Sequence, residues 1–499
     1  MKRKTVMSEQ AQALSGAKEE KFIRMTTQPV EKLINRLAIP TMISMLVTSF
    51  YNLADTFFVR HLEQDSMVAA VGVVLPLMNI IQAIGFYHGH GSGNFISRAF
   101  GRKDLREAEK MAATGFFSAV LLGLLLATLG LLFREPFARL LGAKTPATLG
   151  YTVAYMRYIL LATPFMMGSI VMNNQLRMQG NAFFSMLGLA SGAVLNLFLD
   201  PILIFQAGDA IGLGSLRMGF GAGMGVAGAA LATGISQVVS FCILLVGLHR
   251  SDNVKIRLRN FTPTLYYFKG IFQGGLPSLA RQGVASVATA SLNHAIGLYL
   301  AEPLMIEAAQ AAMTGVNRIM MLLSSALIGF GQGFQPVCGF NYGAKRYDRV
   351  LKAFWYCVRV AVVALLLMAV PGFVFAKPIA NLVAGASREA LEIAVFTFRV
   401  QLVAFPLSAW VVLCNMMLQN IGVTGKATLL ALARQGLAFI PLVFLLPGLL
   451  RLLGLEPLLG IELVQALADV IAFLIAIPIG RSEIRKLEQA RDGQTTPAV

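Results

Sequence analysis

Apolar stretches long enough to cross a bilayer recur along the whole chain. The first runs from Leu37 to Val59, and a helix of about 20 apolar residues spans the ~30 Å hydrocarbon core of a membrane. Inside lipid, only helices and closed barrels satisfy every backbone hydrogen bond, and these stretches are too long and too continuously apolar for barrel strands. Since only 13% of the 499 residues are charged and 56% are hydrophobic, the sequence predicts an all-α, polytopic membrane protein.

We expect twelve transmembrane helices, and the segments between them divide the charges unevenly. The predicted spans are 37–59, 66–96, 112–133, 151–176, 183–206, 222–248, 272–299, 307–340, 353–375, 390–418, 428–450 and 460–480. With the N-terminus in the cytoplasm, 28 of the 42 Lys and Arg fall in cytoplasmic segments, 8 in external loops and 6 within spans. This bias follows the positive-inside rule. The net charge of +17 therefore reflects topology and does not indicate a nucleic-acid partner.

The topology leads to further expectations about the whole protein. No apolar core of signal-peptide type precedes Leu37. We therefore expect a multi-pass protein of the cytoplasmic (inner) membrane with both termini in the cytoplasm, and a monomer.

A shift of 242 residues aligns landmarks in the two halves of the chain. The matching pairs are Gly89 and Gly331, Gly91 and Gly333, Gly101 and Gly343, Lys103 and Lys345, Phe133 and Phe375, Pro136 and Pro378, Pro164 and Pro406, Asn173 and Asn415, and Gly180 and Gly422. Each half contains six spans, an even number, so the repeats enter the membrane in the same orientation and are parallel. Such symmetry is typical of alternating-access carriers, although other membrane proteins also have it.

The repeat and the charge pattern together predict five parts. These are a cytoplasmic N-terminal segment (1–36), a first lobe (37–248), a cytoplasmic linker (249–271), a second lobe (272–480) and a cytoplasmic tail (481–499).

Two carboxylates interrupt the apolar spans of the first lobe at a similar expected depth. Asp55 and Asp200 both lie in the outer half of helices expected to run outward. An acid at the membrane centre costs about 2.5–3.5 kcal/mol, which makes it a functional candidate. Tyr51 and Asn196 each lie four residues before an acid, on the same helix face, and Thr233 of the sixth span adds a hydroxyl. Such a group could hold a shared proton, and its oxygens could equally hold Na⁺.

A structural alternative for each acid is an ion pair with a buried base. Six arginines lie within predicted spans: Arg157, Arg281, Arg318, Arg359, Arg399 and Arg434. In the last span, Asp469 could pair with Arg434 of the preceding helix. This alternative is strongest for Asp469.

Other motifs give no sign of catalysis or of a cofactor. The glycine-rich runs at His88–Gly93 and Gly219–Gly228 follow no strand and lack the Gly-Lys-Ser/Thr ending of a phosphate-binding loop. We expect their glycines to allow close packing or a bend. No His-Glu or paired-Asp metal motif lies within a span, so we expect neither an enzyme nor a bound cofactor.

Several segments in combination resemble the multidrug and toxic compound extrusion (MATE) family. They are the first-span pattern P-x(14)-D-T-x-F-V, NLFLDPILIF at Asn196–Phe205, GAALAT at Gly228–Thr233, LRMQG at Leu176–Gly180 and GFGQGFQPVCGFNYGAKR at Gly329–Arg346. The likeness extends over about residues 31–480 and is greatest to the prokaryotic branch with DinF-like and MepA-like exporters.

The resemblance implies a twelve-helix antiporter of two six-helix lobes around a central cavity. Such a protein exports amphipathic, mostly cationic compounds in exchange for H⁺ or Na⁺. By motif, the cation site of the first lobe falls on Asp55, Asn196, Asp200 and Thr233, with Tyr51 nearby, and Pro40 matches a first-helix proline at which bending has been proposed.

The second lobe departs from the family pattern, because the seventh span lacks the acid that some members carry there. Gln282, Asn293 and Asp469 remain as lesser polar candidates.

A rival interpretation is a flippase of related architecture for a lipid-linked oligosaccharide or a peptidoglycan precursor. It would need a cationic cavity for pyrophosphate, which the arginines within spans could supply. An acid-lined cavity would favour drug export, and an arginine-lined cavity would favour flipping.

Overall fold

The computed structural model describes residues 16, 19–61, 64–209, 219–250, 254–382 and 387–493, without the side chains of Asn52, Asp55, Thr56, Arg60 and Arg250. The helices of the first half are α2 (Val30–Arg60), α3 (Asp65–Gly101), α4 (Leu105–Leu132), α5 (Arg134–Leu141), α6 (Pro146–Met178), α7 (Ala182–Ile204) and α8 (Val226–Arg250). Those of the second half are α9 (Leu265–Tyr299), α10 (Pro303–Gly343), α11 (Tyr347–Val374), α12 (Ala376–Asn381), α13 (Arg388–Ala404), α14 (Ser408–Ile421), α15 (Thr424–Leu432), α16 (Ile440–Leu452) and α17 (Pro457–Arg491).

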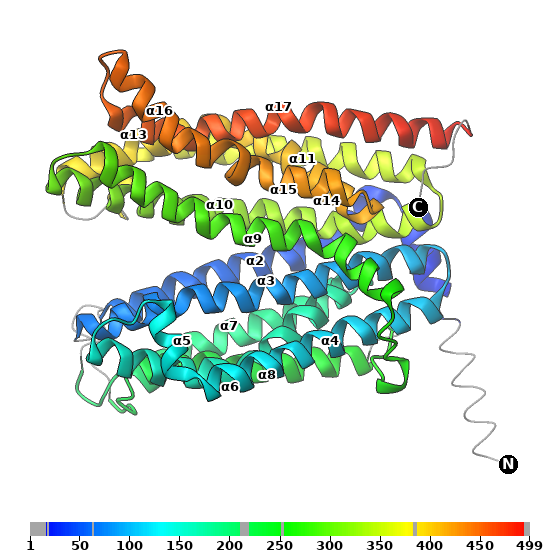
Figure 1. The fold of residues 1–499 in the computed structure, drawn as a ribbon. Helices are drawn as coiled ribbons and strands as arrows, with labels where there is room; N and C mark the ends of the chain where they lie inside the picture. The colour runs from blue at the N-terminus through cyan, green and yellow to red at the C-terminus, as the bar shows by residue number, and fades with distance from the viewer. Residues whose placement is uncertain are drawn as a thin grey trace.

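The helices form two layers that lie side by side (Figure 1). One layer contains α2 to α8 and the other contains α9 to α17. Most contacts between the layers are made by α2 and α3 on one side and by α9 and α10 on the other. The two predicted repeats therefore correspond to two bundles that meet mainly along these four helices.

Eleven helical segments within the described residues are long and apolar enough to cross a membrane, and they coincide with eleven of the twelve predicted spans. The remaining predicted span, 272–299, is the seventh in the chain and lies in α9. This helix is 35 residues long but carries Arg281, Gln282, Asn293 and His294, which explains its lower hydropathy. The chain nevertheless crosses the bundle along α9, because α8 ends where α9 begins and α10 begins at the opposite end.

The predicted repeat is present in the backbone conformation. Helices α4 and α11 are both 28 residues long and begin and end at positions 242 residues apart. Lys103 and Lys345, which precede them, are left-handed with φ of 61° and 56°. Gly180 and Gly422, after α6 and α14, have φ of 80° and 86°. Lysine rarely adopts positive φ, so its occurrence at two matched positions indicates that the two halves repeat one backbone structure.

Side-chain contacts repeat in the same way. Asn173 on α6 donates from Nδ2 to the carbonyl of Ser185 at 2.8 Å, and Asn415 on α14 donates to the carbonyl of Ala427 at 2.6 Å. Each bond ties the end of one helix to the start of the next, across a turn that begins with a left-handed glycine. The predicted pairing of Asn173 with Asn415 thus reflects a shared structural role.

Glycines bring the two halves into backbone contact at one end of the bundle, which we term the closed end. It is the end at which α2 and α9 begin and α3 and α10 end. A Cβ added to Gly101 on α3 would lie 2.2 Å from the carbonyl oxygen of Phe340 on α10. A Cβ on Gly91 would lie 2.3 Å from the carbonyl oxygen of Ile271 on α9. No side chain fits at these positions, as expected for the run at His88–Gly93.

Helix α2 meets α10 through the same kind of contact. A Cβ on Gly333 would lie 2.5 Å from the Cα of Ala38, and one on Gly329 would lie 2.6 Å from the Cα of Met42. The hydroxyl of Thr41 donates to the carbonyl of Gly329 at 2.6 Å. At the opposite end of the bundle, the open end, the two layers diverge (Figure 1).

Polar contacts reinforce the closed end. Arg98 of α3 donates to the carbonyl of Asn420 at 2.7 Å, and Arg349 of α11 donates to the carbonyl of Gln28 at 2.6 Å. Lys352 and Glu31 form an ion pair at 3.1 Å. These bonds join the two halves. Backbone packing, hydrogen bonds and an ion pair therefore all hold the halves together at the closed end.

The segment that connects the halves packs against the closed end of the first half. Its described part, from Val254 to Thr264, contains a short 3₁₀ helix at Leu258–Asn260. The hydroxyl of Tyr267, at the start of α9, donates to the Glu107 carboxylate at 2.9 Å. Burial and this neighbouring acid raise the pKa of Tyr267.

The glycine contacts lead to a prediction about the closed end. We expect Gly333→Ala to separate α2 from α10, because overpacking costs about 1–3 kcal/mol. Cys338, fully buried on α10, is a natural reporter of that separation. In a variant with serine at the other three cysteines, its reaction rate with a maleimide should rise about tenfold, since ~1.4 kcal/mol corresponds to a factor of ten.

The matched control is Gly283→Ala on α9, where an added Cβ meets nothing within 4 Å. An unchanged rate in the Gly333 variant, or an equal rise in the control, would show that the close approach does not hold the closed end together.

Candidate functional site

The candidate cation site of the first half is built on the close packing of α7 against α8. A Cβ on Gly228 would lie 2.3 Å from the carbonyl oxygen of Leu203, and the hydroxyl of Ser240 donates to the carbonyl of Gly188 at 2.7 Å. Backbone bonds from Ala222 to Ile202 and from Gly225 to Ile204 join the residues that precede α8 to the end of α7. This antiparallel contact brings the first turns of α8 level with the last turns of α7.

Three of the sequence-predicted residues meet there. Asn196 and Asp200 of α7 and Thr233 of α8 are all buried. With the Asn196 amide oriented to satisfy both neighbours, its nitrogen donates to Asp200 Oδ2 at 2.9 Å and its oxygen accepts from the backbone N–H of Thr233 at 3.1 Å. The Thr233 hydroxyl oxygen lies 3.4 Å from the same amide. The predicted spacing of four residues therefore does bring Asn196 and Asp200 into contact.

The two remaining first-half candidates lie on α2, which packs against α7. The side chain of Asp55 lies outside the described part of the chain. Its position in α2 is three residues before Phe58, whose ring packs edge-on against Phe205 at 6.4 Å between centroids. Tyr51, one turn earlier, is half-buried. The contact of Phe58 with Phe205 places this part of α2 beside the end of α7 that carries Asp200.

The arrangement suits a small cation. A fully buried carboxylate costs free energy unless its charge is compensated or neutralised. In the orientation described, the Asn196 amide presents an N–H, not its oxygen, to Asp200. A proton can therefore bind Asp200 without any rearrangement. Na⁺ would be held by the Asp200 carboxylate with the Asn196 amide oxygen and the Thr233 hydroxyl, and it would require the amide to turn over.

The second-half candidates have different surroundings. Asp469 on α17 is buried and forms an ion pair with Arg434, with Nε and Oδ1 2.5 Å apart. The structural alternative considered for this acid is thus present in the structure. Gln282 is half-buried and Asn293 is exposed on α9. The structure does not bring these three residues together as the first-half residues are brought together.

Arg434 lies on an irregular piece of helix. Residues Ala433–Phe439 form a π-helical turn between α15 and α16. Such turns are rare and insert a wider ring into the backbone. Gly436 in this turn packs against Val284 of α9, to which an added Cβ would come within 3.2 Å. The turn therefore presents Arg434 to Asp469 while it contacts α9.

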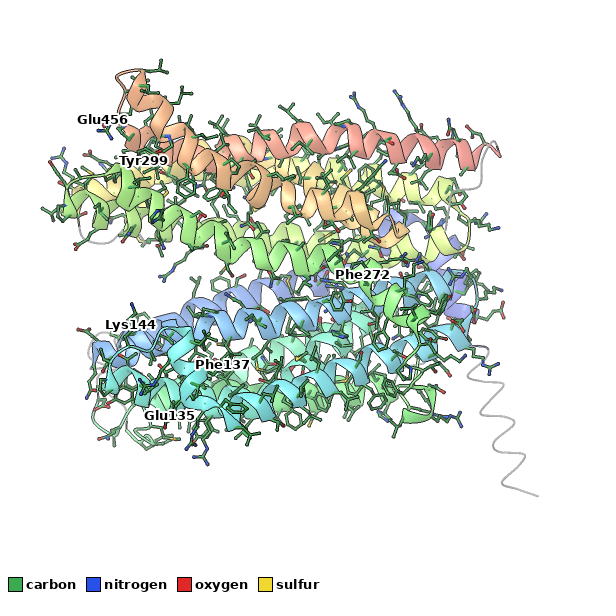
Figure 2. The ribbon with its side chains drawn as sticks, in the orientation of Figure 1. Glu135, Phe137, Lys144, Phe272, Tyr299 and Glu456 are labelled. Atoms are coloured by element: carbon green, nitrogen blue, oxygen red, sulfur yellow. The ribbon has the colours of Figure 1, made fainter. Side chains whose placement is uncertain are left out.

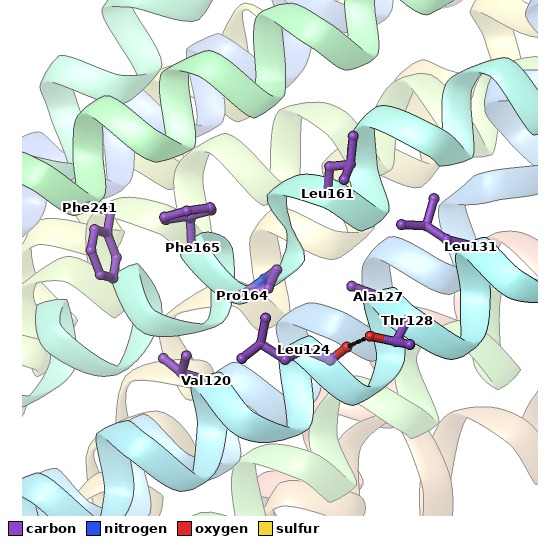
Figure 3. A pocket seen from close by; sticks show the side chains of 9 residues that line it. All are labelled: Val120, Leu124, Ala127, Thr128, Leu131, Leu161, Pro164, Phe165 and Phe241. Carbon is purple, nitrogen blue, oxygen red and sulfur yellow. Dashed lines mark hydrogen bonds between the residues drawn. The ribbon is translucent and has the colours of Figure 1, made fainter. Parts of the chain in front are cut away.

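An apolar cavity of about 360 Å³ lies elsewhere, on the side of the first half formed by α4, α6 and α8 (Figure 3). It is lined by Val120, Leu124, Ala127, Thr128, Leu131, Leu161, Pro164, Phe165 and Phe241. The Thr128 hydroxyl donates to the carbonyl of Leu124 at 2.8 Å, one turn back in its own helix. No ionisable side chain lines the cavity, so it does not form part of the cation site.

The sequence analysis missed a group of basic side chains between the halves. His90 on α3, Arg177 on α6 and Arg281 on α9 interact electrostatically with one another. The sequence gives His90 no evident role, and Arg177 falls between the predicted spans 151–176 and 183–206. The LRMQG motif contains Arg177, but no pattern in the sequence joins it to residues on two distant helices.

The fold and the site define a class: a helical, multi-pass membrane transporter with two parallel six-helix repeats. The MatE family model matches the chain twice, at residues 40–202 and 285–445. The chain therefore belongs to the MATE family of multidrug efflux transporters, which are not enzymes.

The relatives agree with this assignment. The multidrug export protein MepA of Staphylococcus aureus is 26% identical over 462 residues, which cover 92% of this chain and 96% of MepA. A solved structure described as the outward-facing conformation of a multidrug resistance MATE transporter has a TM-score of 0.82 and 27% identity, covering 94% of this chain and 98% of that one. A transporter from Pyrococcus furiosus, described as having a binding pocket of reverse polarity, has a TM-score of 0.81 and 27% identity, with coverages of 93% and 98%.

The Arg434–Asp469 pair leads to a stability prediction. Removing one partner of a buried ion pair costs about 3–5 kcal/mol, and we expect about 2 kcal/mol for Asp469→Ala, because a third of the Arg434 side chain is exposed and solvent compensates part of its charge. The double variant Arg434→Met, Asp469→Leu should recover most of that loss. Thermal unfolding in detergent measures both effects.

The comparison variant is Glu392→Ala, which breaks the exposed Arg388–Glu392 pair and should change stability by less than about 1 kcal/mol. Equal effects of the two single substitutions would contradict a structural role for the Asp469 pair.

Proposed function

We propose that this transporter is a secondary active antiporter that exports amphipathic, mostly cationic compounds in exchange for H⁺ or Na⁺. The observation that carries the proposal is the buried group of Asn196, Asp200 and Thr233 near the open end of the first half. A buried acid at that place has no packing role that an apolar residue could not fill better. Membership in a family that includes MepA, a multidrug export protein, supports the substrate class.

The orientation in the membrane follows from the charges. We assign the closed end to the cytoplasm, because the basic segments before α2, between α3 and α4, and between α10 and α11 all lie there. Both termini are then cytoplasmic, the protein resides in the cytoplasmic membrane, and the state described faces outward. The two lobes are residues 37–248 and 272–480, and the transporter acts as a monomer. Glu135 and Lys144 would then face the outside, at the open end (Figure 2).

The cation drives export by changing the charge of the first half. In the outward-facing state, Asp200 and Asp55 take up H⁺ or Na⁺, with Tyr51, Asn196 and Thr233 as supporting ligands. Neutralised acids no longer attract a cationic substrate, which leaves to the outside. The halves then rock, the cation leaves to the cytoplasm, and the acids are free to attract the next substrate. The transporter has two conformations in equilibrium. Exchange results because the cation and the substrate each shift that equilibrium toward a different conformation.

Helix α2 would transmit the change. Pro40 lies inside α2, between Ala38 and Met42, which contact α10. Proline leaves a backbone carbonyl without its helical partner and so provides a place to bend. We propose that bending at Pro40 couples the charge near Asp55 to the contact between the halves. Gln282, Asn293 and Asp469 of the second half have no part in this cycle.

The flippase alternative is favoured by one observation, the presence of Arg177 and Arg281 between the halves. A pyrophosphate headgroup would require such charges. The similar Pyrococcus furiosus transporter is described as having a binding pocket of reverse polarity and a different function, which supports weighing this alternative.

The central test uses neutral replacements of the acids. Asp200→Asn and Asp55→Asn should each abolish gradient-driven efflux, by at least about a hundredfold in rate, because an amide can neither bind H⁺ nor compensate Na⁺. Efflux of a fluorescent organic cation from proteoliposomes measures the rate, and expression and unfolding temperature report on folding. Asp209→Asn, outside the predicted spans, is the matched control.

The coupling ion is identified by imposing pH and Na⁺ gradients separately in the same vesicles. Efflux driven by either gradient supports antiport and names the ion. Retained efflux in the Asp200 variant would remove that residue from the mechanism, and wild-type efflux that responds to neither gradient would refute antiport itself.

A further inference from the structure

The basic side chains between the halves have no acidic partner. Among the described residues, no carboxylate interacts electrostatically with His90, Arg177 or Arg281. The described contacts of Arg177 are a single hydrogen bond, from Nη2 to Asn174 Oδ1 at 2.6 Å, and its Nε is buried without a partner although the residue is only 2% exposed. Arg281 makes no hydrogen bond or ion pair within the described ranges. A buried cation without a counter-charge is unfavourable unless something else supplies the charge.

The three side chains lie at the junction of the halves. His90 directly precedes Gly91, which contacts α9, and Ser278 on α9 lies with its hydroxyl 2.8 Å from His90 Nδ1. Because α3 runs towards the closed end and α9 away from it, His90 and Arg281 lie just on the open side of this backbone contact. The group therefore lies beside the contact of α3 with α9, where the two halves meet.

One member of this group, Arg281, is partly exposed. Arg281 is surrounded by protein yet keeps part of its surface exposed, whereas Arg177 behind it is fully covered. Phe86 stacks on His90 with centroids 5.5 Å apart and an angle of 13° between the rings. Together they provide N–H donors beside an aromatic face, and Arg281 is the donor that remains partly exposed.

We infer that His90, Arg177 and Arg281 form a binding site for the anionic group of an amphipathic substrate. The guanidinium of Arg281 contacts the oxyanion directly, and the buried guanidinium of Arg177 adds positive charge beside it. This inference rests on the proposed export function and narrows its substrates: a compound with a carboxylate, sulfonate or phosphate beside its apolar or cationic part should bind better than the same compound without it. The acids near the open end would face the other part of such a molecule.

The test compares two dyes that differ only at one group. Rhodamine 19 carries a free carboxylate, and rhodamine 6G is its ethyl ester. Their binding to the purified, full-length protein in detergent is measured by fluorescence polarisation. We expect Arg281→Gln to weaken binding of rhodamine 19 at least tenfold and to leave rhodamine 6G within twofold of wild type. Arg281→Lys, which keeps the charge, should retain most of the affinity for rhodamine 19.

Arg399→Gln is the matched control, because Arg399 also lies within a predicted span but contacts the ring and carbonyl of Phe373. This substitution should leave the binding affinity for both dyes unchanged. If the Arg281→Gln variant loses affinity for both dyes by the same factor, or loses affinity for neither, the proposal of an anion site is overturned.

A second arm identifies the source of the anion. If dihexanoyl phosphatidylglycerol displaces rhodamine 19 and dihexanoyl phosphatidylcholine does not, the site accepts an anionic lipid headgroup, as a flippase requires. If neither displaces it, the site serves soluble amphiphiles. Binding is measured without an ion gradient, so its outcome is independent of antiport. Dye selectivity can persist when gradient-driven efflux fails, and gradient-driven efflux can persist when dye selectivity is absent.

Discussion

The structure depends on direct backbone contact between the two halves at positions where a glycine lets the helices approach. At Gly101 and Gly343, and again at Gly333 and Ala38, the helices approach so closely that a single methyl group would collide with the opposite backbone. At these glycines no side chain of the residue itself has to change rotamer when the helices separate and come together again. A transporter that must open on both sides of a membrane needs such a joint.

The sequence alone predicted the features of the fold and the candidate site that depend on helical periodicity and local backbone conformation. The repeat was visible because turns preserve residues such as Gly180 and Gly422, which must adopt positive φ, and Lys103 and Lys345 repeat the same backbone conformation. The contact of Asn196 with Asp200 was predictable because one helical turn separates them. The meeting of His90, Arg177 and Arg281 was not, since three distant helices bring them together. Arg177 in particular lies at a helix end, which in sequence is indistinguishable from a solvated loop residue.

The two halves share a scaffold but not the candidate cation site. Extending the 242-residue offset from Asn196, Asp200 and Thr233 leads to Ala438, Leu442 and Ile475, which are all apolar. The second half instead has the Arg434–Asp469 pair, in which the acid is already compensated. The duplicated turns are maintained because both halves must fold in the same way. The polar group is confined to one half, so a bound cation changes the charge of the first half alone.

This asymmetry gives α2 a particular place in the molecule. Through Phe58 it contacts the end of α7 that carries Asp200, and through Ala38 and Met42 it contacts α10 at the closed end. A charge change near one end of α2 therefore acts on a helix whose other end forms part of the joint between the halves, with Pro40 in between. The basic group of His90, Arg177 and Arg281 lies beside that joint. A substrate with charges of both signs would respond to both groups, because separating the halves removes the cationic partner of its anion and neutralising the acids removes the anionic partner of its cation.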